Sequence, residues 1–457
     1  MMKRTLLYPA LCVALAATGG TAVANPYEKQ LANGLRVIVK EDHRAPTAIQ
    51  MVWYKAGAVD EKDGTSGVAH VLEHMMFKGT QKVGPGEFSR RVAAAGGREN
   101  AFTSTDYTAY FQMIPKARLA EIMALEADRM GRLALTEKEF SSEIKVVMEE
   151  RRMRTEDEPR ALVGEALRAV AFQAHPYRRP VIGWMNDLEH MNWKDARDWY
   201  RSWYAPNNAV AVIVGDVDHN EVFRLAEKHY GGYAPRALPE RKPQREPEQA
   251  GIKRVTVKAP SKLPYLLMAW KAPRLEDVDK DRDYYALEVL ATVFDGHDAA
   301  RFSKHLVREQ QVAQSAGAGY DGTVRGEALF MFDGQPAEGK TVAELETALR
   351  GELKRVQDEG VSAEELARVK TQTVAAQVYK RDSMMAQAME IGHSEMTGLG
   401  WRNIDKVLEK IRGVTAEEVQ AVAKKYFRDD HLTVAVLDPQ PIDGSKPKKP
   451  VVQRHAR

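Results

Sequence analysis

The stretch His70-Val71-Leu72-Glu73-His74 places two histidines and a carboxylate in the order His-x-x-Glu-His. Residues four apart share one face of a helix, so a helix here would turn both imidazoles toward one point, with Glu73 beside them. Neutral imidazoles suit zinc, and a carboxylate that is not a ligand can take a proton from a zinc-activated water. We therefore expect His70 and His74 to be metal ligands and Glu73 to be a general base.

This order alone does not establish a metal site, because a chain of 457 residues with 12 histidines can contain it by chance. A catalytic zinc ion usually takes three protein ligands and leaves a fourth position to water. We expect Glu150 to be the third ligand, because it lies in a run where Ile144, Val147 and Met148 recur at helical spacing. Glu143, nearly eclipsed with it on such a helix, would orient the ligands. Without the histidine pair, this run would indicate only a solvated acidic helix face.

Three further segments accompany these residues. They are residues 96–103 (Gly-Gly-Arg-Glu-Asn-Ala-Phe-Thr), 106–110 (Asp-Tyr-Thr-Ala-Tyr) and 175–183 (His-Pro-Tyr-Arg-Arg-Pro-Val-Ile-Gly). Together with the His-x-x-Glu-His motif and the later run from Glu143 to Glu150, they resemble the pitrilysin, insulin-degrading enzyme and mitochondrial processing peptidase family. The resemblance covers nearly all of the mature chain, strongly in the first half and loosely in the second.

The resemblance implies an α+β fold of two similar lobes that close like a clam shell over a large polar chamber. It implies a peptidase in which His70, His74 and Glu150 hold one zinc ion per chain. It also implies that Asn100 and Ala101 lie on an edge strand that pairs with an extended peptide, a mode that binds many sequences through the backbone. Without the resemblance, Asn100 would be read as an ordinary residue at the start of a strand.

The second half departs from the family pattern. It has no second His-x-x-Glu-His, and we expect His305 and His393 to be surface residues and not ligands. Self-sufficient members carry an arginine followed seven residues later by a tyrosine, and both contact the substrate carbonyl. Arg308 matches the arginine, but Ser315 stands at the tyrosine position, and Tyr320 comes five residues too late. We therefore expect a related, metal-free partner chain to supply the missing stabilisation in a heterodimer, with a homodimer as the alternative.

Residues 1–24 have the pattern of a secretory signal peptide. A basic pair precedes an apolar stretch over residues 6–17, and Ala24 ends a small-residue cleavage site. The only cysteine, Cys12, lies within this segment, so the mature chain would have neither disulfides nor a catalytic thiol. No later stretch has 18 uninterrupted apolar residues. We expect a protein without a stable membrane anchor that is periplasmic or secreted.

Composition and charge limit the partners and divide the chain. The net charge of +3 argues against nucleic acid as a partner. Residues 236–251 are rich in proline and charge and nearly lack large apolar side chains, which indicates a linker. It would separate a metal-binding peptidase domain, residues 25–235, from an inactive homologous domain, residues 252–440. The basic residues 441–457 would form a disordered tail.

Both halves end in the same pattern, a helical stretch followed by a buried strand. These strands, residues 209–214 and 432–437, hold corresponding places near the ends of the two halves, which indicates two similar units. Any helix followed by a buried strand would give the same pattern. Strands and helices without strict alternation predict the α+β class. We expect further strands at residues 35–39, 49–54, 99–103 and 108–114, and helices at 65–77, 116–133, 137–156 and 159–172.

The leading functional hypothesis is a zinc endopeptidase that acts on peptides or unfolded polypeptide segments. The first alternative is a non-catalytic structural or assembly subunit of the same fold, a role that usually accompanies eroded ligands. The second is a metal-dependent hydrolase of a non-peptide substrate, which the edge strand near Asn100 disfavours. The ligand types leave the metal open between zinc and other ions that accept nitrogen and oxygen.

Overall fold

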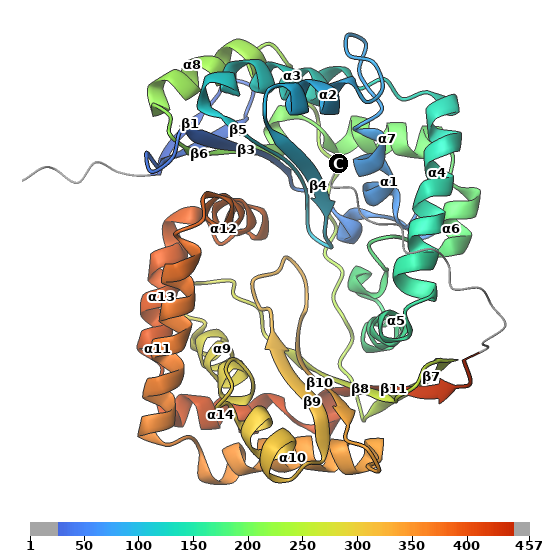
Figure 1. Cartoon of the computed structure of the whole chain (residues 1–457), viewed down its shortest axis with the longest axis vertical. Coiled ribbons are helices and arrows are strands. Elements are labelled where there is room, and N and C mark those ends of the chain that lie inside the picture. Colours follow the sequence, from blue (N-terminus) through green and yellow to red (C-terminus); the bar gives the residue numbers. More distant parts are fainter. Residues whose placement is uncertain (1–25, 443–457) are drawn as a thin grey trace, which may run out of the picture.

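The computed structural model describes residues 26–442, which form two halves of similar architecture (Figure 1). The expected signal peptide, residues 1–24, lies outside the described residues, as does the expected tail beyond residue 442. Each half is built on one mixed sheet with helices packed against it (Figure 1). No helix between residues 26 and 442 is long and apolar enough to cross a membrane.

The sheet of the first half has six strands in the order β1-β2-β6-β3-β5-β4. The strands are β1 (Tyr27–Gln30), β2 (Arg36–Glu41), β3 (Thr47–Tyr54), β4 (Arg98–Thr103), β5 (Thr108–Pro115) and β6 (Ala209–Gly215). β2 and β6 are parallel, and the other neighbours are antiparallel. Within the described part of the chain β4 pairs only with β5, so β4 is an edge strand.

Both faces of this sheet are buried. Successive side chains of a strand point to opposite faces, and in the inner strands both sets of side chains are buried. In β2, Val37 and Val39 pack against helices of the same half, whereas Ile38 belongs to a separate cluster on the other face. The helices of the first half are α1 (Val68–Met75), α2 (Glu87–Ala94), α3 (Leu119–Arg132), α4 (Glu137–Arg151), α5 (Pro159–Ala171), α6 (Met185–His190), α7 (Trp193–Trp203) and α8 (His219–Tyr230). Short helical turns are η1 (Ala58–Asp60), η2 (Lys116–Arg118), η3 (Arg152–Glu156), η4 (Pro176–Arg178) and η5 (Pro206–Asn208).

The sheet of the second half has five strands in the order β7-β11-β8-β10-β9. The strands are β7 (Lys253–Pro260), β8 (Tyr265–Ala272), β9 (Ala313–Tyr320), β10 (Ala328–Pro336) and β11 (Leu432–Gln440). The helical elements are α9 (Arg282–Phe294), η6 (Phe302–Glu309), α10 (Val342–Glu359), α11 (Ala363–Lys380), α12 (Met384–Thr397), η7 (Trp401–Asn403), α13 (Ile404–Arg412), α14 (Ala416–Tyr426) and η8 (Asp429–His431). Apart from α12, the long helices form one apolar core with the sheet.

Apart from the additional strand β1, the two sheets have the same topology. The order β2-β6-β3-β5-β4 in the first half corresponds to β7-β11-β8-β10-β9 in the second. In each half the last strand pairs parallel with one neighbour and antiparallel with the other, and α7 before β6 corresponds to α14 before β11. The prediction of two similar α+β lobes is therefore confirmed.

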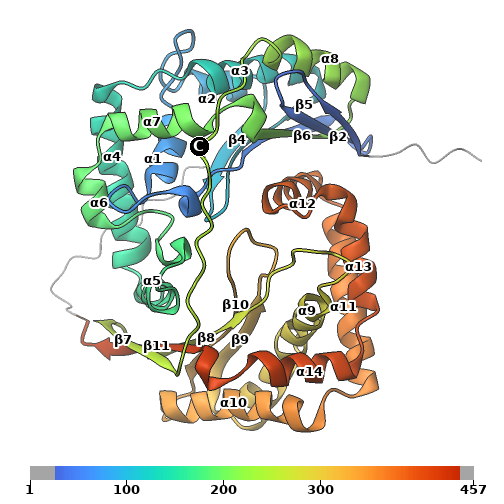
Figure 2. The same cartoon turned by 180° about the vertical axis from the view of Figure 1, so that it is seen from behind.

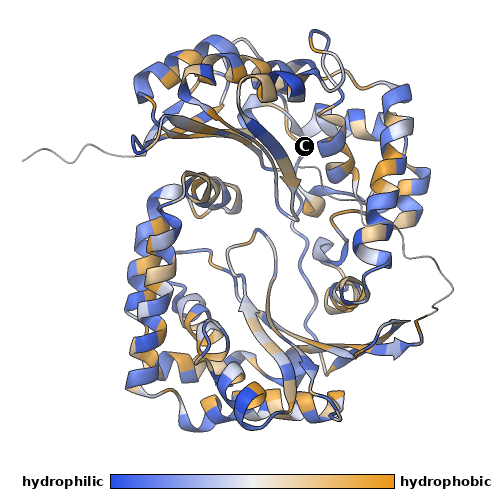
Figure 3. Ribbon diagram, viewed as in Figure 1, coloured by the Kyte–Doolittle hydropathy of each residue, from blue (hydrophilic) through white to orange (hydrophobic). Residues whose placement is uncertain are grey.

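The halves are joined by an exchange of helices. α12 of the second half lies on β3 and β6 of the first sheet, and α5 of the first half lies on β7 and β11 of the second (Figures 1 and 2). Both contacts are apolar, and both sheets carry hydrophobic segments along their strands (Figure 3). Each sheet thus has one face covered by its own half and the other covered by a helix of the opposite half.

The stretch from residue 236 to 250 contains no helix or strand and runs along the back of the molecule from one half to the other (Figure 2). This conformation agrees with the composition from which a linker was expected. The domain limits at residues 235 and 252 remain a prediction.

Several expected elements differ from the structure at their ends. The helix expected from residue 65 begins at Val68, because Gly67 has φ +88°, outside the right-handed helical region. The helix expected over residues 137–156 changes after Arg151 into η3, a π-helical turn. The helix expected over residues 116–133 begins with the turn η2 before α3.

Candidate metal centre

Helix α1, which carries the two histidines of the motif, is fixed at its N-terminus. A Cβ atom at Gly67 would lie 2.6 Å from the carbonyl oxygen of Ile182, so only glycine fits at this position. The buried carboxylate of Glu61 accepts hydrogen bonds from the backbone N–H groups of Gly67 and Ala69, both at 2.9 Å. These bonds satisfy two of the free donors at the start of the helix and place its first turn.

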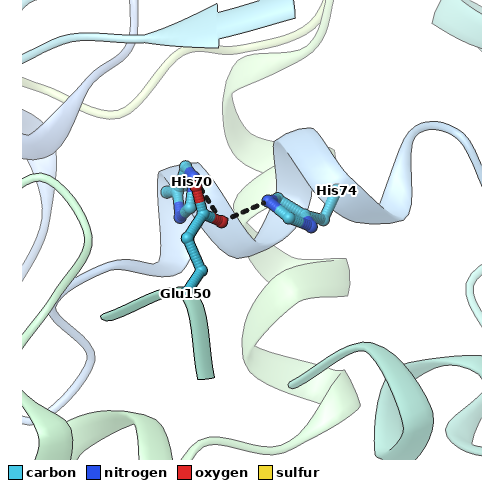
Figure 4. A group of neighbouring side chains, drawn as sticks. All are labelled: His70, His74 and Glu150. Carbon is cyan, nitrogen blue, oxygen red and sulfur yellow. Dashed lines mark ion pairs between the residues drawn. The ribbon is translucent and has the colours of Figure 1, made fainter. Parts of the chain in front are cut away.

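Three side chains from two helices converge beside α1 (Figure 4). His70 and His74 lie on the same face of α1, and α4 packs against α1 and presents Glu150. Oε2 of Glu150 lies 3.2 Å from Nε2 of His74 and 3.8 Å from Nε2 of His70. The structure therefore brings together the two expected histidines and the expected glutamate, although they are far apart in the sequence.

The spacing of these atoms fits a zinc ion. In a tetrahedral site with bonds of about 2.0–2.1 Å, neighbouring ligand atoms are roughly 3.3 Å apart. The ligand atoms of His70, His74 and Glu150 all lie within 4.8 Å of one another, and two imidazoles with one carboxylate are a common donor set of catalytic zinc. A second group of this kind, Glu41, Asp218 and His219, lies elsewhere on the first half.

Burial and charge set the protonation of the three side chains. Burial lowers the pKa of His70 to about 4, so its imidazole is neutral. Burial also disfavours the charged form of His74, but hydrogen bonds with Glu143 and Glu150 outweigh it and raise the pKa to about 9. For Glu150, burial acts against ionisation, yet the hydrogen bond with His74 and the nearby positive charges lower the pKa to about 2. A cation at this position would replace the proton of His74.

Glu143 lies behind His74, on the side away from Glu150. Its Oε1 is 2.9 Å from Nδ1 of His74, and its Oε2 is 2.5 Å from the ammonium group of Lys78. The Nδ1 position of His74 is thereby occupied, which leaves Nε2 to face Glu150. Glu143 was expected here and Lys78 was not; Lys78 lies four residues after His74, beyond the end of α1.

Glu73 contacts the edge strand β4. Its Oε2 accepts a hydrogen bond of 2.6 Å from the hydroxyl of Thr103, the last residue of β4. Burial raises the pKa of Glu73, and the bond from Thr103 opposes that rise. Thr103 was not expected from the sequence, where its only signal was its place at the end of the segment over residues 96–103.

Asn100 and Ala101 lie on β4 and pair with Phe111 and Tyr110 of β5. The side-chain oxygen of Asn100 accepts a 2.9 Å hydrogen bond from the backbone N–H of Ala101. Both residues thus occupy the expected edge strand, whose last residue contacts Glu73.

The expected residues of the second half do not join the three side chains of Figure 4. Arg308 lies on η6, is exposed, and donates a 2.6 Å hydrogen bond to the backbone oxygen of Asp298. Tyr320 is half-buried at the end of β9, where its hydroxyl donates to the backbone oxygen of Pro273. Among the described contacts of Arg308 there is none with α1 or α4.

The expectation that His305 and His393 are surface residues is wrong. Both are half-buried, and each has a hydrogen-bonding partner on a neighbouring element. Nδ1 of His305 lies 2.8 Å from Oε2 of Glu352, and Nδ1 of His393 lies 3.0 Å from the hydroxyl of Tyr107. The second contact joins α12 to the turn between β4 and β5. Sequence spacing could not reveal either partner.

Comparison with known proteins gives matches over almost the whole described chain. Residues 36–184 match the family described as "Insulinase (Peptidase family M16)", and residues 190–373 match "Peptidase M16 inactive domain". "Zinc protease PqqE" of Helicobacter pylori is 30% identical over 90% of this chain and 92% of its own length. "Mitochondrial-processing peptidase subunit beta" of Lentinula edodes is 26% identical over 91% of this chain and 90% of its own length.

Solved structures agree in fold. A protease from Helicobacter pylori matches with a TM-score of 0.86 and 28% identity, over 91% of this chain and 100% of its own. The periplasmic protease PqqL from Escherichia coli matches with a TM-score of 0.79 at 18% identity, and 92% of this chain corresponds to 49% of PqqL. From the relative that is 30% identical over nine-tenths of both chains, together with the two family matches, we conclude that this chain belongs to the insulinase, or M16, family of peptidases.

Proposed function

We propose that this chain is a zinc-dependent endopeptidase of the inverted His-x-x-Glu-His type that hydrolyses peptides or unfolded polypeptide segments. One observation carries the proposal: an oxygen of Glu150 lies 3.2 Å and 3.8 Å from the facing nitrogens of His74 and His70. Glu73 stands beside this group without belonging to it, as a general base requires. The names of the relatives, which include zinc proteases, support the same reading.

In this proposal His70, His74 and Glu150 would hold one zinc ion, which would supply a Lewis acid and favour ionisation of a water. Glu73 would accept a proton from the attacking water and donate it to the leaving amine. The raised pKa of Glu73 suits a group that must both accept and release a proton near neutral pH. Glu143 and Lys78 hold the tautomer and the ring orientation of His74.

The substrate would bind as an additional strand on β4. The free edge of this strand carries Asn100 and Ala101, and its end contacts Glu73 through Thr103. A peptide paired with that edge places a backbone carbonyl next to Glu73, with little dependence on side-chain identity. This arrangement favours a peptide over a non-peptide substrate.

We also propose that the active unit contains a second, related chain. The tyrosine expected seven residues after Arg308 is absent, and Ser315, on β9, stands at that position. PqqL is a single chain about twice as long, of which this chain matches 49%. A partner without metal ligands could supply the missing donors, and a second copy of this chain is the alternative. The signal-peptide pattern over residues 1–24 supports export to the periplasm or the medium.

The non-catalytic alternative is disfavoured, because the three candidate ligands and the base are present and converge in space. Two measurements on the purified chain test the proposal: elemental analysis of the metal, and mass-spectrometric mapping of products from a mixed peptide library. We expect one zinc per chain and internal cleavage of extended peptides. Glu73→Gln should keep the zinc and lose cleavage, whereas a chain that cleaves nothing with zinc bound, alone and with a related metal-free chain, would refute the enzyme proposal.

A further inference from the structure

One arginine contacts the candidate ligand set directly. Nη1 of Arg154 lies 2.5 Å from Oε1 of Glu150, the oxygen that does not face the two imidazoles. Arg154 lies on η3, the π-helical turn that follows α4, four residues after Glu150. Turns of this kind often occur at functional sites, because they re-aim side chains within a helix.

Most of the guanidinium of Arg154 remains free. Its side chain is 62% exposed, and within residues 26–442 its only ion-pair partner is Glu150. An arginine has five N–H donors, and the edge formed by Nε and Nη2 has no partner among the described residues. Two parallel donors of this kind match a carboxylate in a bidentate pair.

The neighbouring arginines are engaged differently. Arg151 is buried and pairs with Glu165, while Arg152 pairs with Glu149 at 3.1 Å on the surface. Arg154 alone of the three is paired with a candidate ligand.

The surrounding helix face is open. Val146 lies one helical turn before Glu150 on α4, and Met153 immediately precedes Arg154 on η3. Val146 is 49% exposed and Met153 is 45% exposed, which is unusual for large apolar residues in this chain. No described residue covers this face, so a peptide can reach both the apolar pair and Arg154.

The charge balance favours an anion at this position. Between residues 26 and 442, Glu150 is the only carboxylate that forms an ion pair with Arg154, and a divalent ion held by Glu150 would use the same carboxylate. The loaded site then carries a guanidinium whose charge is no longer neutralised by its partner. A carboxylate brought by the substrate would restore the balance through a bidentate pair with the free edge of the guanidinium.

We propose that Arg154 forms a substrate subsite beside the ligand set that binds a carboxylate of the peptide, next to the scissile bond. This proposal rests on the proposed peptidase function. The carboxylate can come from an acidic side chain or from a free C-terminus, since both present the same pair of oxygens. Val146 and Met153 flank this subsite with apolar surface.

The test uses one cleaved sequence from the peptide library in four forms. Glu or Gln stands next to the scissile bond, and each peptide ends in either a free acid or an amide. For the full-length zinc-loaded chain we expect kcat/KM to be roughly tenfold to hundredfold higher for the form with the recognised carboxylate. Arg154→Ala should retain zinc and cleave all four peptides with nearly equal kcat/KM, whatever its overall rate, and Arg154→Lys should retain part of the preference. Arg152→Ala is the matched control and should leave kcat/KM for all four peptides as in the wild type.

Binding without turnover gives a second readout. In a Glu73→Gln background, fluorescence anisotropy should give the same preference for the carboxylate peptide, and Arg154→Ala should remove it. A preference that follows the side chain identifies an acidic residue, and one that follows the free terminus identifies the α-carboxylate. Equal use of all four peptides by the wild type would overturn the subsite. So would an Arg154→Ala variant that loses zinc and all four activities equally, because Arg154 would then only orient Glu150.

The two proposals can fail separately. If the zinc-loaded chain cleaves the neutral peptides and shows no carboxylate preference, the peptidase stands and the subsite is wrong. If no peptide is cleaved but the Glu73→Gln variant binds the acidic peptide through Arg154, the subsite stands and the peptidase function is wrong.

Discussion

The hydroxyl of Thr103 donates a 2.6 Å hydrogen bond to Oε2 of Glu73. This bond joins the end of the edge strand β4 to helix α1, two elements that are separate in the sequence. The carboxylate proposed as base is therefore held by the strand proposed to bind the substrate. A peptide placed on β4 and the group that acts on it share one rigid frame.

Thr103→Val removes this donor and keeps the shape of the side chain. A hydrogen bond to a charged group contributes about 1.5–3 kcal/mol, so we expect kcat/KM to fall roughly tenfold to hundredfold. Thr103→Ser keeps the hydroxyl, so its kcat/KM should fall far less. Steady-state kinetics on one library-derived peptide would decide, and equal activity of the Val and Ser variants would mean that the bond does not position Glu73.

The pair Glu143 and Lys78 should control metal affinity. Glu143→Gln weakens the hold on Nδ1 of His74, and Lys78→Met removes the ammonium group that orients Glu143. Loss of such supporting contacts typically lowers metal affinity roughly 10- to 100-fold, and we expect that range for each variant in a chelator competition with zinc. Glu137→Gln, an exposed change at the start of α4, is the control. Affinities equal to the wild type would show that His74 is oriented by its packing alone.

Local patterns predicted much of the first half, because its helices and strands have strong apolar periodicity. The ligand triad could be placed because His70 and His74 are one helical turn apart and Glu150 lies on a second amphipathic helix. Arg154 and Lys78 carried a weaker signal of the same kind, since each lies four residues after a candidate ligand. Thr103 carried almost none, because its contact depends on how β4 meets α1.

The exchange of helices between the halves could not be read from the sequence. Periodicity indicates that α5 and α12 have apolar faces, but it does not tell which sheet each face will cover. The same limit explains the error at His393, whose partner Tyr107 is 286 residues away. Contacts of this range are fixed by the packing of whole lobes and not by local spacing.

Arg325 should contribute strongly to the cohesion of the two halves. It lies between β9 and β10 and donates to both carboxylate oxygens of Asp60, at 2.8 and 2.9 Å, and to the backbone oxygen of Asp106. The side chains of Arg325 and Asp60 are 12% and 3% exposed. Asp60 keeps a second partner in Arg241, 2.6 Å away, so Arg325→Ala should cost less than the loss of a sole partner and lower the free energy of unfolding in urea by about 2–3 kcal/mol.

The control for Arg325 is Arg254→Ala. Arg254 also makes two hydrogen bonds to one carboxylate, that of Glu346, but it is 52% exposed and stays within its own half. We expect a loss below about 1 kcal/mol. If both variants lost a similar amount of unfolding free energy, the contact of Arg325 between the halves would stabilise the protein no more than an exposed ion pair does.

Glu246 anchors the stretch expected to be a linker. Its carboxylate accepts hydrogen bonds from three successive backbone N–H groups, those of Gln173, Ala174 and His175, at 2.7, 2.9 and 2.9 Å. Lys271 lies 3.1 Å away, and the side chain of Glu246 is only 2% exposed. Such a group of N–H donors binds anions well. Burial opposes the charge of Glu246, but these bonds outweigh it and lower the pKa to about 2.

Glu246→Gln should therefore destabilise the protein in a pH-dependent way. An unfolded glutamate has a pKa near 4.5, so between that value and 2 the unfolded state binds more protons and stability rises with pH. The contribution of Glu246, about 3 kcal/mol, is complete above pH 4.5 and is lost as the pH falls toward 2. In urea unfolding at pH 7, the free energy of unfolding of Glu246→Gln should be lower than that of the wild type by this amount. The gap between the two free energies should narrow below pH 4.5. The exposed neighbour Glu248→Gln should follow the wild type at every pH, and a gap for Glu246→Gln that stays constant down to pH 3 would show that the three N–H groups do not stabilise the charge.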